Sequence, residues 1–497
     1  MVQTLNIPLP DLSAIAPELI LTAWVCGVLL IDLFIPKDRK HYVGILSLVG
    51  LTLTFLCSGY LYLRGENLSL FGGMLAVDGF ALYFKMVFVV VVMLTIAISL
   101  RYLPLEEINL GEYYGILLFA TLGMMVMAAS TDLITIYLSL ELMSLSIYIL
   151  AGFIKKDPKS IEAALKYFLL GAFSSGILLY GMALLYGLSG TTNLSGIGSY
   201  FAQHDLSHEP TAILAMILLI AGFAFKIAAV PFHMWVPDVY EGAPTPVTAF
   251  MSVGPKAAAF AALMRIFLVA IVAVRPHWNS IFWGLAVLSM TIGNVVAIAQ
   301  TSLKRMLAYS SIAHAGYVLI GIVAGNQIGY ASVLLYVLVY VFMNLGAFSM
   351  IILLCTKSGR GDQIKDFTGL ARVNPWAAAA FVVFFLSLAG IPPTGGFVGK
   401  LYIFAAAIQA NYVGLAIIGV LNSAISLYYY FRVVMAMYME ELPGPLHLST
   451  HPVLVFALTV MVLATLFLGL YPGPFIDAAM SSMAPLLPKA GVLASHF

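Results

Sequence analysis

Long apolar runs separated by short polar turns recur along the whole chain, and several reach the ~18 residues that a membrane-spanning helix needs. Reading them between turn signals predicts about fourteen spans. The spans begin near Pro17, Tyr42, Val77, Tyr113, Leu133, Ile161, Thr211, Pro246, Ile281, Leu307, Ala331, Ala377, Val413 and Val453. No long stretch alternates apolar and polar residues with period two, as the strands of a membrane β-barrel would. The pattern therefore predicts an all-α polytopic membrane protein.

Two of the predicted spans are broken by proline. The run 211–237 is interrupted at Pro231 and Pro237. The run 377–409 would be about 50 Å long as one helix, against a hydrocarbon core of about 30 Å, and it contains Pro392 and Pro393. These prolines remove backbone donors and free carbonyl groups, which a membrane protein tolerates only beside a polar cavity. We therefore expect two discontinuous helices.

Broken helices in corresponding places of two halves indicate an ion site in inverted-repeat transporters. Spans four to eight and nine to thirteen form two blocks of five, and the broken helix is the fourth span of each block. Because five is an odd number, the second block is inverted in the membrane relative to the first. The expected segments are an N-terminal three-helix segment (1–112), two five-helix repeats that each form a proton half-channel (113–274 and 275–439), and a C-terminal helix and tail (440–497).

The distribution of basic residues among the loops predicts the orientation. Those after odd-numbered spans are Lys37, Arg39, Lys40, Arg101, Lys155, Lys156, Lys159, Lys304, Arg305, Lys357, Arg360, Lys365 and Arg372. Loops after even-numbered spans carry only Arg64 and Arg275. Because loops rich in Lys and Arg stay in the cytoplasm, both termini are predicted on the other side. The longest connection, 188–210, then becomes an outer surface loop whose His204 and His208 are a weak metal candidate.

Composition agrees with this architecture, since 62% of the residues are hydrophobic and 9% charged, with a mean hydropathy of +1.02. Residues 1–17 contain no Lys or Arg, so the first span is expected to be retained rather than cleaved as a signal peptide. The cysteines Cys26, Cys57 and Cys355 are far apart, which excludes a Cys-ligated iron–sulfur or zinc motif. No Gly-rich nucleotide fingerprint is present. We expect no cofactor and no metal in this chain.

Six basic side chains lie in or beside the apolar runs: Lys85, Lys166, Lys226, Lys256, Arg265 and Lys400. A charge at membrane depth is costly and marks an ion path by default. Glu141 is the lone charge of its predicted helix after the helix start, so it needs a basic partner, and Lys226 is the natural candidate. Glu162 and Lys166, at i and i+4, form a second pair.

Lys256, His314 and Lys400 complete a line of titratable groups near the bilayer centre, with His233 beside the first break. Lysine suits proton transfer because its proton affinity responds to burial and to a nearby carboxylate. Either histidine can relay a proton or only hold a backbone carbonyl. The line predicts proton or cation translocation; the alternative is buried ion pairs that merely fix helix register.

For other polar residues a structural interpretation is favoured. Asp78 starts a predicted helix, and Lys85 can snorkel toward the interface. Arg265 is always charged, so we expect it to act electrostatically rather than to carry protons. The tyrosines at 428–430 are typical of packing or interfacial anchors.

One long motif makes the chain resemble a known family. Residues 225–246 read FKIAAVPFHMWVPDVYEGAPTP and are followed by Gly-Pro-Lys at 254–256. This run resembles the antiporter-like membrane subunits of respiratory complex I, and among them most closely the subunit N branch. The stretches LELMS (140–144), EAALK (162–166) and IPPTGGFVGK (391–400) agree with it. The resemblance covers residues 113–439.

The resemblance implies a fourteen-helix fold with inverted repeats and a non-redox subunit of a proton-translocating NADH:quinone oxidoreductase. By position, it implies that Glu141 and Lys226 form a regulatory ion pair, that Lys256 is the central relay and that Lys400 is the terminal group. A lysine at 400 favours subunit N over the related subunit M, which carries a glutamate there. FMN, the iron–sulfur clusters and the quinone site are then expected in partner subunits.

The resemblance also implies a multi-pass location in the bacterial inner membrane. The expected partners are the other membrane and peripheral subunits of complex I, the lipid bilayer and protons, and not nucleic acid. Two rival functions remain: a subunit of an Mrp-type cation/proton antiporter, which shares the broken-helix lysine, and a membrane scaffold that does not pump. A ferredoxin-driven version of the same complex is a further alternative.

Overall fold

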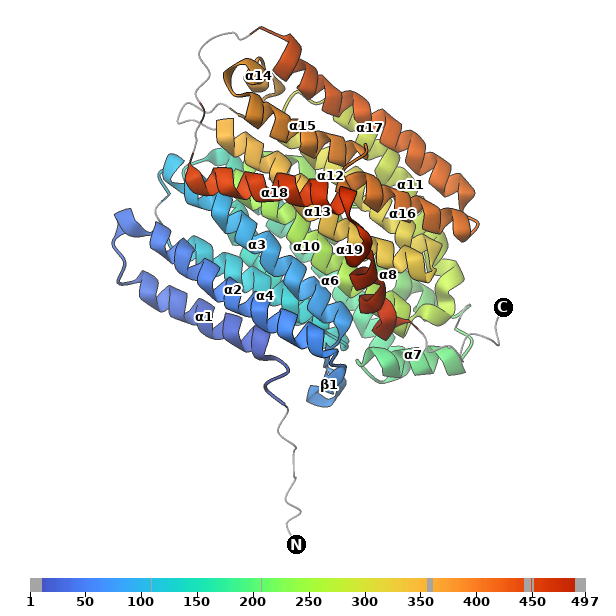
Figure 1. Cartoon of the computed structure of the whole chain (residues 1–497). Helices are drawn as coiled ribbons and strands as arrows, with labels where there is room; N and C mark the ends of the chain where they lie inside the picture. The colour runs from blue at the N-terminus through green and yellow to red at the C-terminus, as the bar shows by residue number, and fades with distance from the viewer. Residues whose placement is uncertain are drawn as a thin grey trace.

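The computed structural model describes residues 11–108, 110–206, 208–354, 361–441, 448 and 451–487. The first half holds α1 (Ala16–Asp32), α2 (His41–Arg64), α3 (Gly79–Leu105), α4 (Glu112–Ala129), α5 (Leu133–Ala151), α6 (Pro158–Ser189), α7 (Leu194–Gln203), α8 (Pro210–Ile227), α9 (Val236–Gly242) and α10 (Thr245–Arg265). The second half holds α11 (Arg275–Ile298), α12 (Leu303–Ala324), α13 (Gln327–Leu354), α14 (Leu370–Val373), α15 (Pro375–Ala389), α16 (Gly395–Gln409), α17 (Val413–Met439), α18 (Pro452–Leu470) and α19 (Gly473–Met483). The long helices run side by side, with α1 on one flank of the bundle and α17 on the other (Figure 1).

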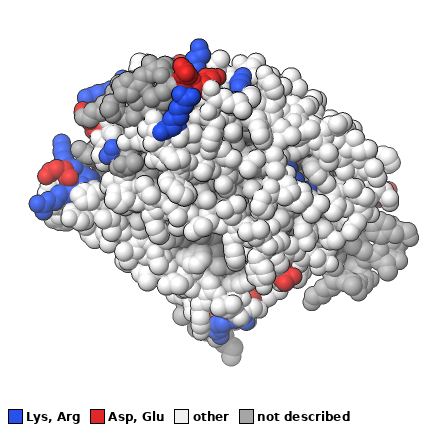
Figure 2. Space-filling model, turned by 45° about the horizontal axis from the view of Figure 1, so that its top comes forward, with Lys and Arg blue, Asp and Glu red and all other residues white. Residues whose placement is uncertain are grey.

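Twelve helices of the described residues are long and apolar enough to cross a membrane: α2, α3, α4, α5, α6, α8, α10, α11, α12, α13, α17 and α18. The other two predicted spans correspond to α1, with 17 residues, and to the pair α15 and α16, with 15 residues each. Figure 2 shows a surface that is largely uncharged, with most of the visible Lys and Arg gathered toward its edges. The prediction of a mostly helical, polytopic membrane protein is therefore confirmed.

The first predicted break lies between α8 and α9. Ala228 adopts the left-handed conformation (φ 63°), and the backbone N–H of Ala229 bonds back to the carbonyl of Ala224, which ends α8. Pro231 then lies in the irregular segment, as predicted. Pro237 falls in the first turn of α9, where proline is well tolerated and helps a helix to start.

The second break separates α15 from α16 and contains Pro392 and Pro393. Gly390 follows α15 with φ 85°, a conformation that L side chains rarely adopt. A Cβ at this position would also lie 2.7 Å from Cδ of Lys400. Glycine is therefore required here on two grounds, backbone conformation and the close approach of the lysine.

The centre of the bundle is formed by α10, α12 and α13, which are buried over almost their whole length. In helices such as α2, α6 and α18, fewer than half of the residues in the most apolar stretch are buried. A short antiparallel hairpin, β1 (Leu68–Leu70) and β2 (Leu75–Val77), precedes α3. Most polar groups on the three central helices, Lys256 and His314 among them, are thus removed from the surface of the chain.

The connection 188–210, expected to be a loop, contains the ten-residue helix α7. Asn193 caps this helix by accepting hydrogen bonds from its first turn. The predicted segment boundaries fall next to helix ends, at α4, α11 and α17. The inverted relation of the two five-helix blocks stays a prediction. Cys355, Lys357 and Arg360 lie outside the described residues.

Candidate functional site

Lys226 lies in the last turn of α8, directly before the first break, and only 5% of it is exposed. Its Nζ donates a hydrogen bond to Oγ of Ser144 on α5 (2.8 Å). The ammonium group also lies 5.9 Å from the centroid of the Tyr148 ring. Lys226 therefore faces α5, as expected, but its direct partner is a hydroxyl.

The expected ion pair between Glu141 and Lys226 is not formed in the described residues, where no such contact lies within 4.0 Å. Glu141 shares a face of α5 with Ser144 and Tyr148, at i, i+3 and i+7. Its Oε1 is buried without a hydrogen-bond partner in the described part of the chain. The hydroxyl of Ser144, one turn along α5, takes the place that the prediction gave to the carboxylate.

Lys256 lies on the central helix α10 and is 5% exposed. Its Nζ donates to the backbone carbonyl of Ser311 (3.0 Å) and to the hydroxyl of the same residue, both on α12. Next to it lies a cavity of about 20 Å³, lined in part by Ser311, His314, Tyr336 and Tyr340. This space is large enough for about one water molecule.

His314 is buried on α12 and comes between Lys256 and Lys400 in the predicted line of titratable groups. Its Nδ1 lies 2.7 Å from the hydroxyl of Tyr336, and its Nε2 lies 3.3 Å from the hydroxyl of Tyr430. Tyr430 in turn contacts the hydroxyl of Ser310 at 2.5 Å. The tyrosines at 429 and 430, interpreted from the sequence as packing residues or interfacial anchors, are fully buried and hydrogen-bonded, which agrees with the first of these alternatives.

Lys400 lies on α16, just after the second break. Its Nζ donates to the carbonyls of Leu388 (3.0 Å) and Ala389 (2.9 Å) and to Oγ of Ser423 (2.8 Å). The ammonium group also lies 4.7 Å from the centroid of the Tyr317 ring. Both carbonyls belong to the last turn of α15, whose free C=O groups carry the negative end of the helix dipole. The break thus frees carbonyl groups toward a polar partner, as predicted.

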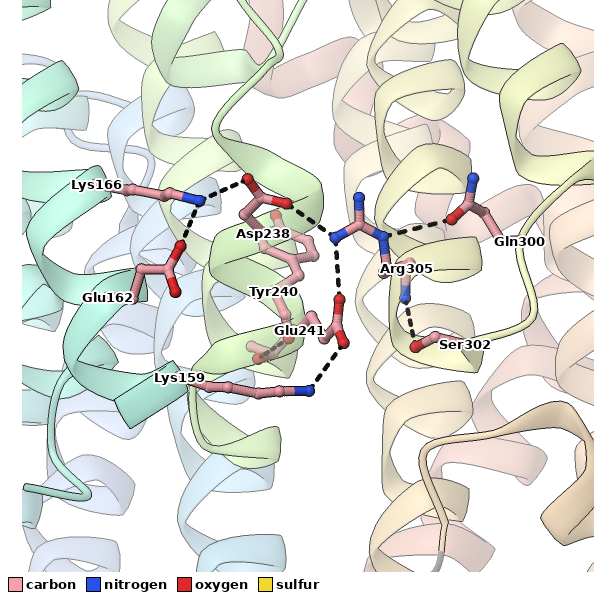
Figure 3. Close-up of polar contacts among 10 residues, drawn as sticks. Lys159, Glu162, Lys166, Asp238, Tyr240, Glu241, Gln300, Ser302 and Arg305 are labelled. Atoms are coloured by element: carbon pink, nitrogen blue, oxygen red, sulfur yellow. Dashed lines mark hydrogen bonds and ion pairs between the residues drawn. The ribbon is translucent and has the colours of Figure 1, made fainter. Parts of the chain in front are cut away.

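The pair of Glu162 and Lys166 forms as expected, with Nζ 2.7 Å from Oε1 of Glu162, but it lies in an exposed network instead of the buried line. Lys166 also binds Asp238 of α9 (3.0 Å), and Arg305 of α12 binds both Asp238 (2.8 Å) and Glu241 (2.9 Å) (Figure 3). A pocket of about 120 Å³ opens beside these groups. Sequence reasoning missed the role of Asp238, Glu241 and Arg305.

Asp238 and Glu241 lie outside the membrane spans. Partial burial raises the pKa of each carboxyl group, but hydrogen bonds and charges from Arg305 and the neighbouring lysines outweigh it and hold both pKa values below their usual range. The i, i+3 spacing of these carboxylates, directly after Pro237, is the sequence signal that could have found them.

Two further buried ion pairs lie away from the line. Lys85 is fully buried and pairs with Glu18 of α1 (2.6 Å), so the expectation that it snorkels to the interface is wrong. Asp78 caps α3 and also receives the Arg265 side chain at 2.8 and 3.0 Å. Arg265 is thereby neutralised in place, in agreement with an electrostatic role.

His233 lies in the first break and is 8% exposed, and its Nδ1 has no hydrogen-bond partner in the described residues. No group of three or more His, Cys, Asp or Glu side chains that could hold a metal ion occurs in that part of the chain. Nδ1 of His204 lies 3.0 Å from the carbonyl of Tyr200.

Comparison with known proteins adds the family. Residues 130–426, well over half of the chain, match the model of the NADH:quinone oxidoreductase/Mrp antiporter transmembrane family. NADH-quinone oxidoreductase subunit N of Trichlorobacter lovleyi is 48% identical over 97% of this chain and 98% of its own. The chain belongs to the subunit N family of NADH-quinone oxidoreductase. Subunit N of Moorella thermoacetica is 46% identical over 95% of this chain and 98% of its own.

Solved structures include similar chains in respiratory complex I and in an Mrp complex. A chain of respiratory complex I from Thermus thermophilus superposes with a TM-score of 0.80 at 34% identity, covering 94% of this chain and 99% of the other. A chain of the Mrp complex from Dietzia sp. DQ12-45-1b has a TM-score of 0.85 at 20% identity, covering 96% of this chain and 98% of the other. At that identity the second likeness establishes the shared fold alone.

Proposed function

We propose that this chain is a proton-translocating membrane-arm subunit of NADH-quinone oxidoreductase, driven by electron transfer in other subunits. The observation that carries the proposal is that Lys226, Lys256 and Lys400 are each buried in the bundle and bonded to hydroxyl or carbonyl oxygens. Lysine can exchange its proton, whereas arginine cannot. None of the three is tied to a carboxylate within 4.0 Å in the described residues, so none is fixed in its charged form by an ion pair.

The contacts around these lysines support the proposed path for the proton. Lys256 binds Ser311, and the small cavity beside it also reaches His314. His314 contacts the hydroxyl of Tyr430, and its ring lies 5.7 Å from that of Tyr317, whose ring faces the ammonium group of Lys400 at 4.7 Å. Hydroxyl groups both donate and accept hydrogen bonds, so they can pass a proton between basic groups. The chain itself supplies no redox group in this scheme; FMN, iron–sulfur clusters and the quinone site belong to partner subunits.

Glu141 controls the first lysine in this proposal. When its carboxylate approaches Lys226, the proton is held; when Lys226 turns to Ser144, as in this structure, the proton is freed toward Lys256. We further propose the full fourteen-span count, the inverted five-helix repeats and a location in the bacterial inner membrane with both termini outside the cytoplasm. The distribution of Lys and Arg among the loops supports the orientation.

The test is the proton-to-electron ratio of the complex with Lys226→Ala, measured in vesicles during oxidation of NADH by quinone. We expect this ratio to fall clearly, because the first proton carrier is lost, while Lys156→Ala, an exposed loop variant, keeps the parental ratio. A parental ratio with Lys226→Ala contradicts the proposal. Purification without redox subunits, together with sodium-dependent exchange, supports the Mrp-type antiporter instead.

A further inference from the structure

Six charged side chains form a network across three elements at one end of the bundle. The members, called here the Arg305 network, are Lys159, Glu162, Lys166, Asp238, Glu241 and Arg305. They come from α6, α9 and α12, and Figure 3 shows Arg305 reaching from α12 to the two carboxylates of α9. The network thus joins a helix of the second five-helix block to two helices of the first.

Arg305 is the link between the blocks. Its Nη1 lies 2.8 Å from Oδ1 of Asp238 and 2.9 Å from Oε2 of Glu241, so one guanidinium group holds two carboxylates. Those carboxylates lie at i and i+3 of α9 and therefore face the same side. The backbone N–H of Arg305 donates a hydrogen bond to Oγ of Ser302, the N-cap residue of α12. The contact thus joins the first turn of α12 to the short helix α9.

The short helix α9 is not continuous with α8. It is separated from α8 by the irregular residues 228–235, so no continuous ladder of helix hydrogen bonds fixes it to the helix that carries Lys226. Half-helices of this kind can shift as small units. Tyr240, on the same short helix, presents its ring 6.0 Å from Nζ of Lys256. Trp235, just before α9, donates to the carbonyl of Phe225, next to Lys226.

α12 carries the groups that receive the proton. Ser311, which binds Lys256, lies six residues after Arg305, about 9 Å along the helix, and His314 lies one turn further. We propose that Arg305 is a positioning residue that couples α9 to α12, so that the surroundings of Lys226 and of Lys256 change together. This inference rests on the proposed function and adds a residue that sets the coupling between its two halves.

The charges of the network suit a fixed link and not a proton carrier. Arg305 does not lose its proton in proteins. The carboxyl groups of Asp238 and Glu241 have pKa values held below their usual range by the same contacts, so both stay charged at neutral pH. Isolated ion pairs on a surface contribute little, but a guanidinium shared by two carboxylates restrains geometry more strongly.

The test uses Arg305→Gln in the whole complex. We expect at least a twofold lower proton-to-electron ratio per assembled complex, because α9 loses both of its ion pairs with Arg305 of α12. Arg305→Lys, which keeps the charge, should restore most of the ratio. Lys159→Gln is the matched control: it also removes a contact to Glu241 (3.3 Å), but the lysine is 69% exposed and does not reach α12. A parental ratio for Arg305→Gln overturns the inference.

A second measurement covers the case in which Arg305→Gln assembles poorly. Asp238→Asn and Glu241→Gln each leave Arg305 with one carboxylate and should lower the ratio by less than Arg305→Gln does. Combining Asp238→Asn with Arg305→Gln should add little to the loss, since both remove the same contact. Additive losses, or lower amounts of complex with a parental ratio, show a purely structural role and overturn the inference.

Lys226→Ala is measured alongside these variants to separate the two proposals. If it lowers the ratio while Arg305→Gln does not, only the coupling by Arg305 fails. If Lys226→Ala keeps the parental ratio, the proposed function fails as well.

Discussion

At the scale of single residues, this protein places lysine ammonium groups among neutral oxygens. Lys400 meets two backbone carbonyls and a hydroxyl, and Lys226 meets a hydroxyl beside an aromatic ring. These partners stabilise a charge without holding it as firmly as a carboxylate does. Lys85, in contrast, is paired directly with Glu18 and is better suited to structure than to transport.

Tyr430→Phe tests the polar relay around His314. The variant removes the hydroxyl that contacts Nε2 of His314 and Ser310 while keeping the ring. One lost hydrogen bond is worth about 1 kcal/mol, so we expect a pumping rate lower by about fivefold. Tyr428→Phe is the control, since Tyr428 is exposed on the same helix. Equal pumping rates in the two variants would argue against a relay through Tyr430.

Lys85→Met tests the buried pair with Glu18. Removing one partner of a buried ion pair leaves an uncompensated charge and typically costs about 3–5 kcal/mol, so we expect a clear loss of thermal stability and of assembled complex. The double variant Lys85→Met with Glu18→Gln should recover part of that loss. The proton-to-electron ratio of the complex that does assemble should stay parental; a lower ratio would place Lys85 in the path.

At the scale of elements, the two helix breaks decide where the lysines meet polar partners. Each break ends a helix early and leaves its last carbonyls without intrahelical donors. In the second break these carbonyls are the ligands of Lys400. The first break instead separates α9 from α8, and Arg305 joins α9 to α12.

Gly390→Ala tests the second break. The native φ of 85° is unfavourable for alanine, and the new Cβ would lie 2.7 Å from Cδ of Lys400. We expect a destabilisation of more than about 1 kcal/mol and a reduced pumping rate. Gly414→Ala on α17 is the control, because a Cβ there meets nothing within 4 Å. Equal thermal stability of both variants would contradict this account of the break.

The link between α9 and α12 should be insensitive to pH near neutrality. The carboxyl group of Asp238 has a lowered pKa in the folded protein, so its contribution is present above the unfolded pKa of about 3.9 and is lost only as the pH falls through the lower folded value. Asp238→Asn should therefore reduce the proton-to-electron ratio by the same factor at pH 6 and at pH 8. A much smaller effect at pH 6 would mean that the carboxylate titrates in this range.

At the scale of the whole molecule, the bundle separates a central layer from its flanks. α10, α12 and α13 are enclosed by the other helices, and two of them carry Lys256 and His314. The flanking helices leave apolar side chains at the surface, where lipid or neighbouring subunits can cover them. The Arg305 network lies at the end of the bundle where several of the basic loops gather.

The orientation of the whole bundle can be tested by cysteine labelling. A single cysteine at Lys156 should react with a membrane-impermeant maleimide from the cytoplasmic side, because its loop is rich in basic residues. A cysteine at Gln203, near the end of α7, should react only from the opposite side. The reverse pattern would mean that the orientation is inverted.

The sequence by itself determined the class of the fold and the position of both breaks. Apolar runs long enough to span a bilayer leave no other way to satisfy the backbone than helices, and Pro231, Pro392 and Pro393 cannot continue a helix. It also indicated that Lys226, Lys256 and Lys400 are buried, because each lies within an apolar run, whereas the side chain of Lys166, chosen on the same ground, is partly exposed.

Only the tertiary structure decided which groups those lysines meet. Lys226 binds Ser144 and not Glu141, and Arg305 joins Asp238 and Glu241, because helices far apart in sequence pack side by side. Local spacing fixes which residues share one face of a helix. It does not fix which neighbouring helix that face meets, since the distance between two side chains on different helices depends on how the helices are rotated and packed.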